Sequence, residues 1–114
     1  MNSKRKGNRA ERELLRLLQS YGLDAHRNDQ TYIGGIDNPD IAVKIGPVSV
    51  HVECKRVERL SLAAALRQAH RDANGHAFPV VAHRRNREPW LITMELADLV
   101  EVLGYERACV QSEE

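Results

Sequence analysis

The sequence predicts a single α/β domain in which helices flank a small mixed β-sheet, in the order αβββαββα. Three observations support this class. The chain has 114 residues, which is close to the commonest domain size, and its 42% hydrophobic content can form a core. Apolar residues near the start follow the period of a helix, and those of 41–54 alternate as in strands. We therefore expect one domain over 1–114, with a basic N-terminal arm (1–8) and a loosely held tail (105–114).

The first element is a predicted helix over residues 8–21. The residues that recur at helical spacing are Ala10, Leu14, Leu15, Leu17, Leu18 and Tyr21, and Gly22 follows as a stop signal. Residues 23–27 are short enough to form the first strand. A polar loop that contains glycines then occupies residues 28–38.

Residues 38–55 are expected to form a β-hairpin around Gly46 and Pro47. Glycine supplies the positive φ that the first position of a two-residue hairpin turn requires. This turn fixes the pairing, because a slip of one residue would exchange the apolar and polar faces of the hairpin. The predicted pairs are Ile45 with Val48, Lys44 with Ser49, Val43 with Val50, Ala42 with His51, Ile41 with Val52, and Asp40 with Glu53.

Residues 61–103 supply the remaining elements. Ser61 is a candidate N-cap for a helix that ends near Asn74 and Gly75, with an apolar stripe of Leu62, Ala65, Leu66 and Ala69. Residues 78–82 and 90–92 have the composition of strands, and a basic turn (83–87) separates them. Thr93 could cap a last helix that ends at Leu103.

Several protein classes are not indicated by the sequence. No apolar run approaches the roughly 20 residues that span a membrane, and the polar start is unlike a signal peptide, so we expect a cytoplasmic protein. Cys54 and Cys109 lack the spacing of a zinc site, and the five histidines show no ligand spacing. We therefore expect neither a disulfide nor zinc.

The net charge of +1 conceals a strong regional division. Residues 1–27 carry seven basic and three acidic side chains, and residues 55–90 carry eight basic and three acidic ones. Residues 28–54 have a net charge of −3 and residues 91–114 of −5. An acidic centre between basic segments suits a nucleic-acid backbone, although basic segments on soluble domains are commonly only solvated faces.

The hairpin register places Asp40 opposite Glu53, with Lys55 on the same face of the strand. Opposed carboxylates lie roughly 4.5–5.5 Å apart at Cβ, and their repulsion destabilises the hairpin unless a cation offsets it. Both could therefore bind one metal ion, which predicts a metal-dependent phosphodiesterase. The alternative is a structural salt bridge between Lys55 and Glu53.

Two sequence patterns carry a family resemblance. Asn38-Pro39-Asp40 followed after twelve residues by Glu53-Cys54-Lys55 resembles the signature of the PD-(D/E)XK nuclease superfamily. The segment 6–13, a leucine-rich helix, Tyr21-Gly22-Leu23 and Arg27 resemble the opening of archaeal-type Holliday junction resolvases. The resemblance implies a restriction-endonuclease-like fold.

The resemblance also implies roles for individual residues. Asp40, Glu53 and the main-chain carbonyl of Cys54 would bind Mg²⁺, which Mn²⁺ should be able to replace, and Glu11 would act on the same metal through a water. Lys55 would hold or help deprotonate the attacking water, because charge develops at the phosphate in the transition state. The implied products carry 5′-phosphate and 3′-hydroxyl ends. The resolvases have a serine before Pro-Asp, which this sequence lacks; Thr31 supplies the nearest hydroxyl.

A few further side chains could join the site. Glu13 is about 200° around the helix from Glu11, so both cannot face one metal, and the resemblance favours Glu11. Gln68 could reach the site from the second helix, although a surface position is as reasonable. His51 shares the face of Glu53 and could touch substrate or simply be covered. Trp90 and Phe78 fit the core better than a base-stacking surface.

We therefore predict a Mg²⁺-dependent endonuclease, a homodimer that cuts branched DNA, foremost four-way junctions, by paired nicks. A dimer is expected because symmetric cutting of two strands needs two sites. The alternatives are a related nuclease for flap, damaged or restriction-like DNA, and a DNA-binding module without catalysis. The expected DNA contacts are Lys4, Arg5, Lys6, Arg9, Arg12, Arg27, Thr31, Arg56, Arg59, Arg84, Arg85 and Arg87.

Overall fold

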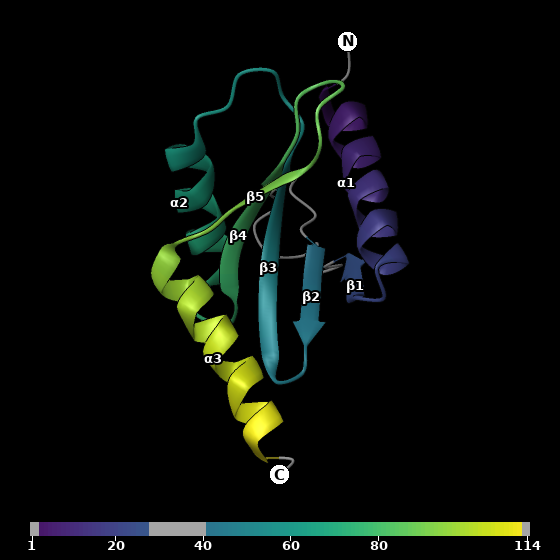
Figure 1. Ribbon diagram of the computed structural model, residues 1–114. Helices are drawn as coiled ribbons and strands as arrows, with labels where there is room; N and C mark the ends of the chain where they lie inside the picture. The colour runs from purple at the N-terminus through teal and green to yellow at the C-terminus, as the bar shows by residue number, and fades with distance from the viewer. Residues whose placement is uncertain (1–2, 28–40, 113–114) are drawn as a thin grey trace.

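The computed structural model describes residues 3–27 and 41–112, and it describes the side chains of residues 9–27 and 41–104. Their order confirms the predicted αβββαββα arrangement (Figure 1). The elements are α1 (Ser3–Ser20), β1 (Asp24–Arg27), β2 (Ile41–Ile45), β3 (Val48–Lys55), α2 (Leu62–Ala73), β4 (Phe78–His83), β5 (Leu91–Thr93) and α3 (Leu96–Ser112).

The five strands form one mixed sheet in the order β1-β2-β3-β4-β5. Only β3 and β4 are parallel, because α2 forms the crossover between them; the other neighbours are antiparallel. The predicted hairpin register is confirmed from Ile41↔Val52 to Ile45↔Val48, and Gly46 has the required positive φ of 59°. Asp40, whose predicted partner is Glu53, lies outside the described residues.

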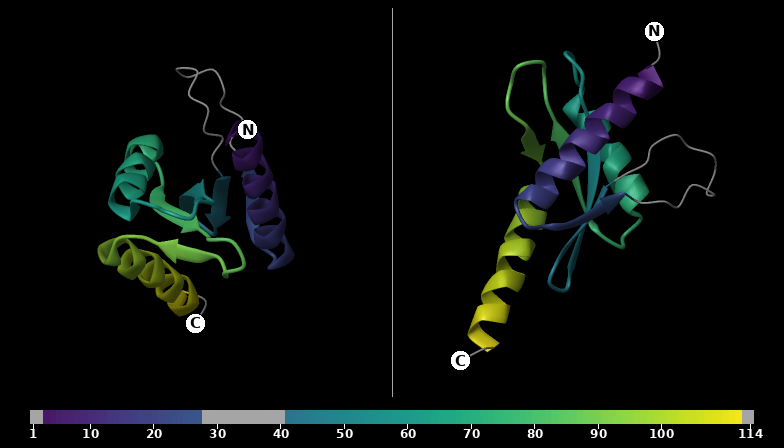
Figure 2. Two further views of the ribbon diagram at one scale, coloured as in Figure 1. Left: turned by 90° about the horizontal axis from the view of Figure 1, so that it is seen from above. Right: turned by 90° about the vertical axis from the view of Figure 1, so that its right-hand side faces the viewer.

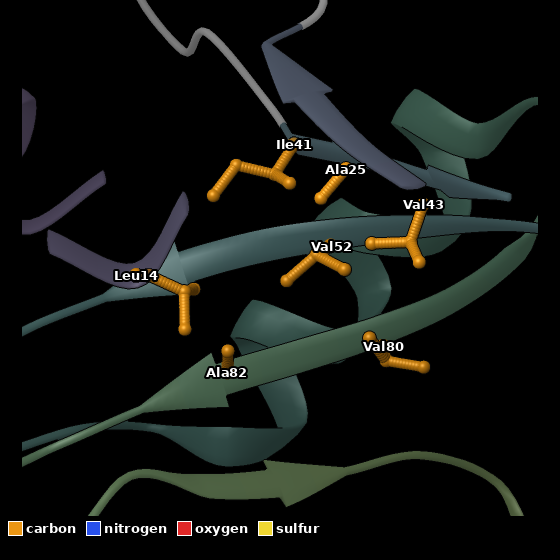
Figure 3. Packing of buried hydrophobic residues seen from close by; sticks show 7 residues of the cluster. All are labelled: Leu14, Ala25, Ile41, Val43, Val52, Val80 and Ala82. Carbon is orange, nitrogen blue, oxygen red and sulfur yellow. The ribbon is translucent and has the colours of Figure 1, made fainter. Parts of the chain in front are cut away.

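Helices α1 and α2 cover opposite faces of the sheet (Figure 2, left). Under α1, Leu14 packs over Val52 and Ala82 in the main core (Figure 3), which comprises Leu14, Ala25, Ile41, Val43, Val52, Val80 and Ala82. Under α2, a smaller cluster joins Ala65 and Ala69 to Val81. The central strand β3 is therefore covered on both faces, and charged groups on it are removed from water.

Helix α1 is longer than predicted. It begins at Ser3 rather than at residue 8, so the backbone of the expected N-terminal arm is helical from Ser3 onward. Lysine and arginine are good helix formers, which allows the helix to extend through Gly7. Gly22, with φ of 85°, follows the helix end as predicted, whereas Tyr21 is 73% exposed and does not belong to the apolar face.

Helix α2 confirms the predicted caps but shifts the apolar stripe. The Ser61 side chain accepts a hydrogen bond from Ala64 N, and Asn74 ends the helix in the left-handed conformation. The buried residues are Ala65, Ala69 and Ala73, whereas Leu62 is 39% exposed, so its place in the stripe was wrong. Small alanines let α2 approach the sheet closely.

Helix α3 differs from the prediction at both ends. Thr93 belongs to β5, where its Oγ1 lies 2.9 Å from His83 Nε2, and the first helical hydrogen bond runs from Leu99 N to the carbonyl of Glu95. The helix continues past Leu103 to Ser112, so the backbone of residues 105–112 is helical. A single interior glycine costs only about 1 kcal/mol relative to alanine, and good helix formers on both sides of Gly104 offset this cost.

Helix α3 extends away from the sheet (Figures 1 and 2). It carries an outward apolar stripe at i, i+3, i+4 and i+7, composed of Leu96, Leu99, Val100 and Leu103, which are exposed by 75%, 39%, 60% and 50%. Within the described residues, no helix combines the length and apolar character needed to cross a membrane.

Candidate active site

The site is built on the covered central strand β3. Glu53 pairs with Val81 of β4, and Val81 belongs to the cluster under α2, so the Glu53 side chain lies on the α2 side of the sheet. Strand alternation places His51 on the same side. Glu53 is only 2% exposed and His51 only 6%. A carboxylate this deeply buried requires polar partners or a cation.

Glu53 has two such neighbours on the α2 side. His51 Nε2 lies 3.4 Å from Glu53 Oε2, and Asp72 approaches Glu53 from α2. Ligand-capable atoms of His51, Glu53 and Asp72 all lie within 4.8 Å of one another. The structure thus confirms that His51 is close to Glu53, and it adds Asp72, which sequence reasoning missed.

Asp72 is protonated more readily than an ordinary aspartate. Partial desolvation of this exposed side chain, together with the charge of Glu53, raises the pKa of Asp72. A helical pattern could have indicated this residue, because positions 65, 69 and 72 share one face of the crossover helix. Gln68 lies on the same face and is half-buried.

Glu11 reaches the site from α1, on the other side of the sheet. It is 7% exposed, and its Oε1 lies 3.6 Å from Arg27 Nη2. Burial raises the pKa of Glu11 to about 7; Arg27 opposes this effect, and the nearby Glu53 carboxylate adds to it. The charge of Glu53 is therefore felt at Glu11, although the two side chains lie on opposite faces of the sheet.

These residues fit a hard divalent cation. Oε1 of Glu11 is buried without a hydrogen-bond partner among the described residues. Carboxylate oxygens are the ligands that Mg²⁺ and Mn²⁺ prefer. A cation held by either carboxylate would offset the cost of burying that carboxylate.

Lys55 ends β3 and is half-buried opposite His83 of β4. No ion pair joins Lys55 to Glu53 in the part of the chain that the structure describes, so the structural salt bridge considered from the sequence is absent there. Burial, reinforced by Glu11 and Glu53, raises the pKa of Cys54 to about 12. The thiol is therefore neutral, and of the groups of Cys54 the main-chain carbonyl is better suited to a hard cation.

Comparison with known proteins identifies the family. The family model described as "Phage putative PDDEXK endonuclease" matches residues 2–113. The chain belongs to this PDDEXK endonuclease family. The model covers nearly all of the sequence, including the Glu53-Cys54-Lys55 segment and Glu11.

The solved structures add a resolvase neighbour. The PDDEXK endonuclease is similar to Hjc, a Holliday junction resolvase from the archaeal hyperthermophile Archaeoglobus fulgidus, with 27% identity and a TM-score of 0.59. The match covers 76% of this chain and 75% of Hjc. No curated protein matches. The restriction-endonuclease-like fold and the resolvase resemblance expected from the sequence are thereby confirmed.

Glu13 of the PDDEXK endonuclease has a different role from Glu11. Its Oε2 accepts a hydrogen bond from Arg56 Nη1 at 3.3 Å, and its Oε1 accepts one from Trp90 Nε1 at 3.2 Å. Arg84 Nη1 also donates to Oε1. Glu13 therefore ties α1 to the segment after β3 and to the connection between β4 and β5, as sequence reasoning did not foresee.

The predicted DNA contacts of the endonuclease occupy several places. Arg9 and Arg12 are exposed on α1, and Arg59, Arg85 and Arg87 are exposed after β3 and β4. Arg27 lies beside Glu11, whereas Arg56 and Arg84 are paired with Glu13. The backbone of Lys4, Arg5 and Lys6 lies in α1, but their side chains, like Thr31, fall outside the described residues.

Proposed function

We propose that the chain is a metal-dependent, structure-selective DNA endonuclease that hydrolyses phosphodiester bonds in branched DNA, foremost four-way junctions. The observation that carries this proposal is a pair of buried carboxylates whose charges affect each other, Glu11 on α1 and Glu53 on the Glu-x-Lys strand β3, in a chain of the PDDEXK endonuclease family. The similarity to Hjc supports the choice of substrate.

Asp40, Glu53 and the Cys54 carbonyl would hold Mg²⁺, with Glu11 acting on it through a water. The ion would supply positive charge at the scissile phosphate. Lys55, half-buried at the end of β3, would orient the attacking water, take part in its deprotonation and balance the charge that develops. Asp72 and His51 would orient Glu53 from the α2 side. The proposed products carry 5′-phosphate and 3′-hydroxyl ends.

The proposed enzyme acts as a homodimer. Each chain supplies one site, and two strands of a junction must be cut symmetrically. The apolar α3 stripe (Leu96, Leu99, Val100 and Leu103) supports this assembly, because an outward-facing row of this kind is typical of a helix that packs on a partner.

Cleavage assays test the proposal. Labelled four-way junction, flap and linear duplex would be incubated with the purified protein in Mg²⁺, in Mn²⁺ or in EDTA. The Asp40→Asn and Glu53→Gln variants would be assayed alongside, with Lys44→Ala as a control for a charge elsewhere on the hairpin. We expect paired, metal-dependent nicks in the junction, and loss of cutting in both site variants.

Other outcomes discriminate the alternatives. Preferential cutting of a flap or linear duplex would support the proposed phosphodiester hydrolysis but contradict the four-way junction as the substrate. DNA binding without cutting at any metal concentration would indicate a binding module. Cutting that survives Asp40→Asn would contradict the assignment of the site.

A further inference from the structure

A second charged feature lies beside α1, apart from Glu11. A cavity of about 1080 Å³ is lined by Arg9, Arg12, Glu13, Arg16, Leu17, Arg84 and Trp90. We call these residues the arginine pocket. Four of the seven are arginines, and Glu13 is the only acid among them. Arg16 was not assigned to DNA contact from the sequence.

The charge of the arginine pocket is largely unpaired. Oε1 of Glu13 accepts from Arg84 and Trp90, and its Oε2 accepts from Arg56, which lies outside the pocket. Over the part of the chain that the structure describes, Arg9, Arg12 and Arg16 form no ion pair. Like charges at these helical spacings destabilise a helix by a few tenths of a kcal/mol per pair, a cost that a bound anion would offset.

The geometry of α1 separates the pocket from the catalytic carboxylates. Arg9 and Glu13 are each two residues from Glu11, which is about 200° around a helix. Glu11 is buried toward the sheet, whereas Arg9, Arg12 and Arg16 are exposed. A phosphate bound by these three arginines would therefore lie on a different face of α1 from Glu11.

The spacing of the arginines suits a polyanion rather than a single small anion. Arg9 and Arg16 lie on one side of α1, two turns or roughly 10 Å apart along its axis, whereas phosphates of one strand rise about 3.4 Å per nucleotide. Guanidinium groups bind phosphate through paired N–H donors. The half-buried Trp90 ring is fixed by its bond to Glu13, so we expect backbone contact without base stacking.

We propose that the arginine pocket binds a stretch of DNA backbone away from the scissile phosphate, with Arg9, Arg12 and Arg16 as phosphate contacts and Glu13 positioning Arg84. This inference rests on the proposed function for the identity of the polyanion. It assigns a second contact surface to the enzyme and a DNA-binding role to Arg16.

The test measures affinity for a four-way junction in EDTA, where no cutting can interfere, across a series of salt concentrations. The variants are Arg16→Ala, Arg16→Lys and Arg9→Ala/Arg16→Ala. Arg67→Ala, an exposed arginine on α2, is the matched control. At about 0.1 M salt, we expect the double variant to bind roughly tenfold or more weakly, and each lost arginine to reduce the slope of log K against log salt by about 1.

Arg16→Lys should keep the slope of the unmodified protein, because it retains the charge. The pocket assignment would be overturned if the double variant bound with the same affinity and the same salt slope as the Arg67→Ala control and the unmodified protein. This holds even if junction cutting is observed. Conversely, if the unmodified protein binds but never cuts in Mg²⁺, the proposed function fails while the pocket can still be confirmed by the expected losses. Unchanged melting temperatures would confirm that the variants are folded.

Discussion

A carboxyl oxygen of Asp72 on α2 lies within 4.8 Å of the carboxylate of Glu53 on β3. Desolvation and the nearby charge of Glu53 raise the pKa of Asp72, so this carboxyl group is protonated more readily than an ordinary aspartate and, when protonated, can donate to Glu53. The crossover helix therefore holds a polar group beside Glu53, the carboxylate of the neighbouring strand that is proposed to bind the metal ion.

This relationship predicts different effects for two substitutions of Asp72. Asp72→Ala should slow junction cleavage roughly 10–100-fold, the usual cost of removing a group that orients a metal ligand. Asp72→Asn should stay within a few-fold of the unmodified rate, because its amide can still donate to Glu53. Single-turnover cleavage in saturating Mg²⁺ would measure both, with the exposed Glu101→Ala on α3 as control. An unchanged rate in Asp72→Ala would contradict the orienting role.

Glu11 predicts a pH-dependent stability. Its pKa rises from 4.5 to about 7 on folding, so the folded state holds the proton more tightly than the unfolded chain does. The resulting stabilisation is complete below about pH 4.5 and is lost as pH rises through about 7. At pH 8, Glu11→Gln should therefore be more stable than the unmodified protein by roughly 2–3 kcal/mol, and this difference should diminish toward pH 4.

Urea unfolding in EDTA across this pH range would measure the difference. Added Mg²⁺ should stabilise the unmodified protein more at pH 8 than at pH 5, because protonated carboxyls are poor ligands. A pH-independent difference between Glu11→Gln and the unmodified protein would show that the buried carboxyl does not titrate as inferred.

The proposed role of Lys55 predicts that its removal slows DNA cleavage and scarcely weakens DNA binding. Removing one preorganised positive group from the reacting phosphate commonly costs 10²–10³-fold in rate, so we expect about that loss for Lys55→Ala. Junction affinity in EDTA should change by no more than a few-fold, because other cations contact the backbone. Lys44→Ala, at an exposed position of β2, controls for a lost lysine. A large loss of affinity with an unchanged cleavage rate would assign Lys55 to substrate binding instead.

The hydrogen bonds that Glu13 accepts predict that its removal lowers the free energy of unfolding. Glu13→Ala leaves Arg56, Arg84 and the Trp90 indole without their shared acceptor, and both arginine side chains are only 23% exposed. We expect the free energy of unfolding to fall by roughly 1–3 kcal/mol. Glu13→Gln should lose less, because its amide oxygen still accepts one bond. Urea denaturation would measure these changes, and a loss no larger than that of the exposed control Glu58→Ala would contradict the role of Glu13.

The α3 stripe predicts the assembly state. Leu96→Glu/Val100→Glu should convert a dimer into a folded monomer, because charges would replace the two most exposed residues of the stripe. Sedimentation velocity would report mass, and the junction assay should show single rather than paired nicks. A monomeric unmodified protein, or a dimer that tolerates both substitutions, would contradict this interface.

The hairpin shows what could be predicted from local sequence. Gly46 supplies the turn conformation, and alternating apolar residues enforce one register, so the pairing from Ile41↔Val52 to Ile45↔Val48 could be predicted residue by residue. Helix ends were less predictable. The continuation through Gly104 and the assignment of Thr93 to β5 depend on small energies that neighbouring residues and tertiary partners decide.

By itself, the sequence determined the order of elements and the hairpin register, because periodicity and turn chemistry act over a few residues. The register supplied Asp40, Glu53 and Lys55 as candidates, and the family resemblance added Glu11. Only the tertiary structure decided which distant groups meet. The crossover helix brings Asp72 to Glu53, and Glu13 gathers arginines from two later segments. Helix α1 presents Glu11 on one side and the arginine pocket on another. These contacts depend on how helices pack on the sheet, which spacing along one chain does not specify.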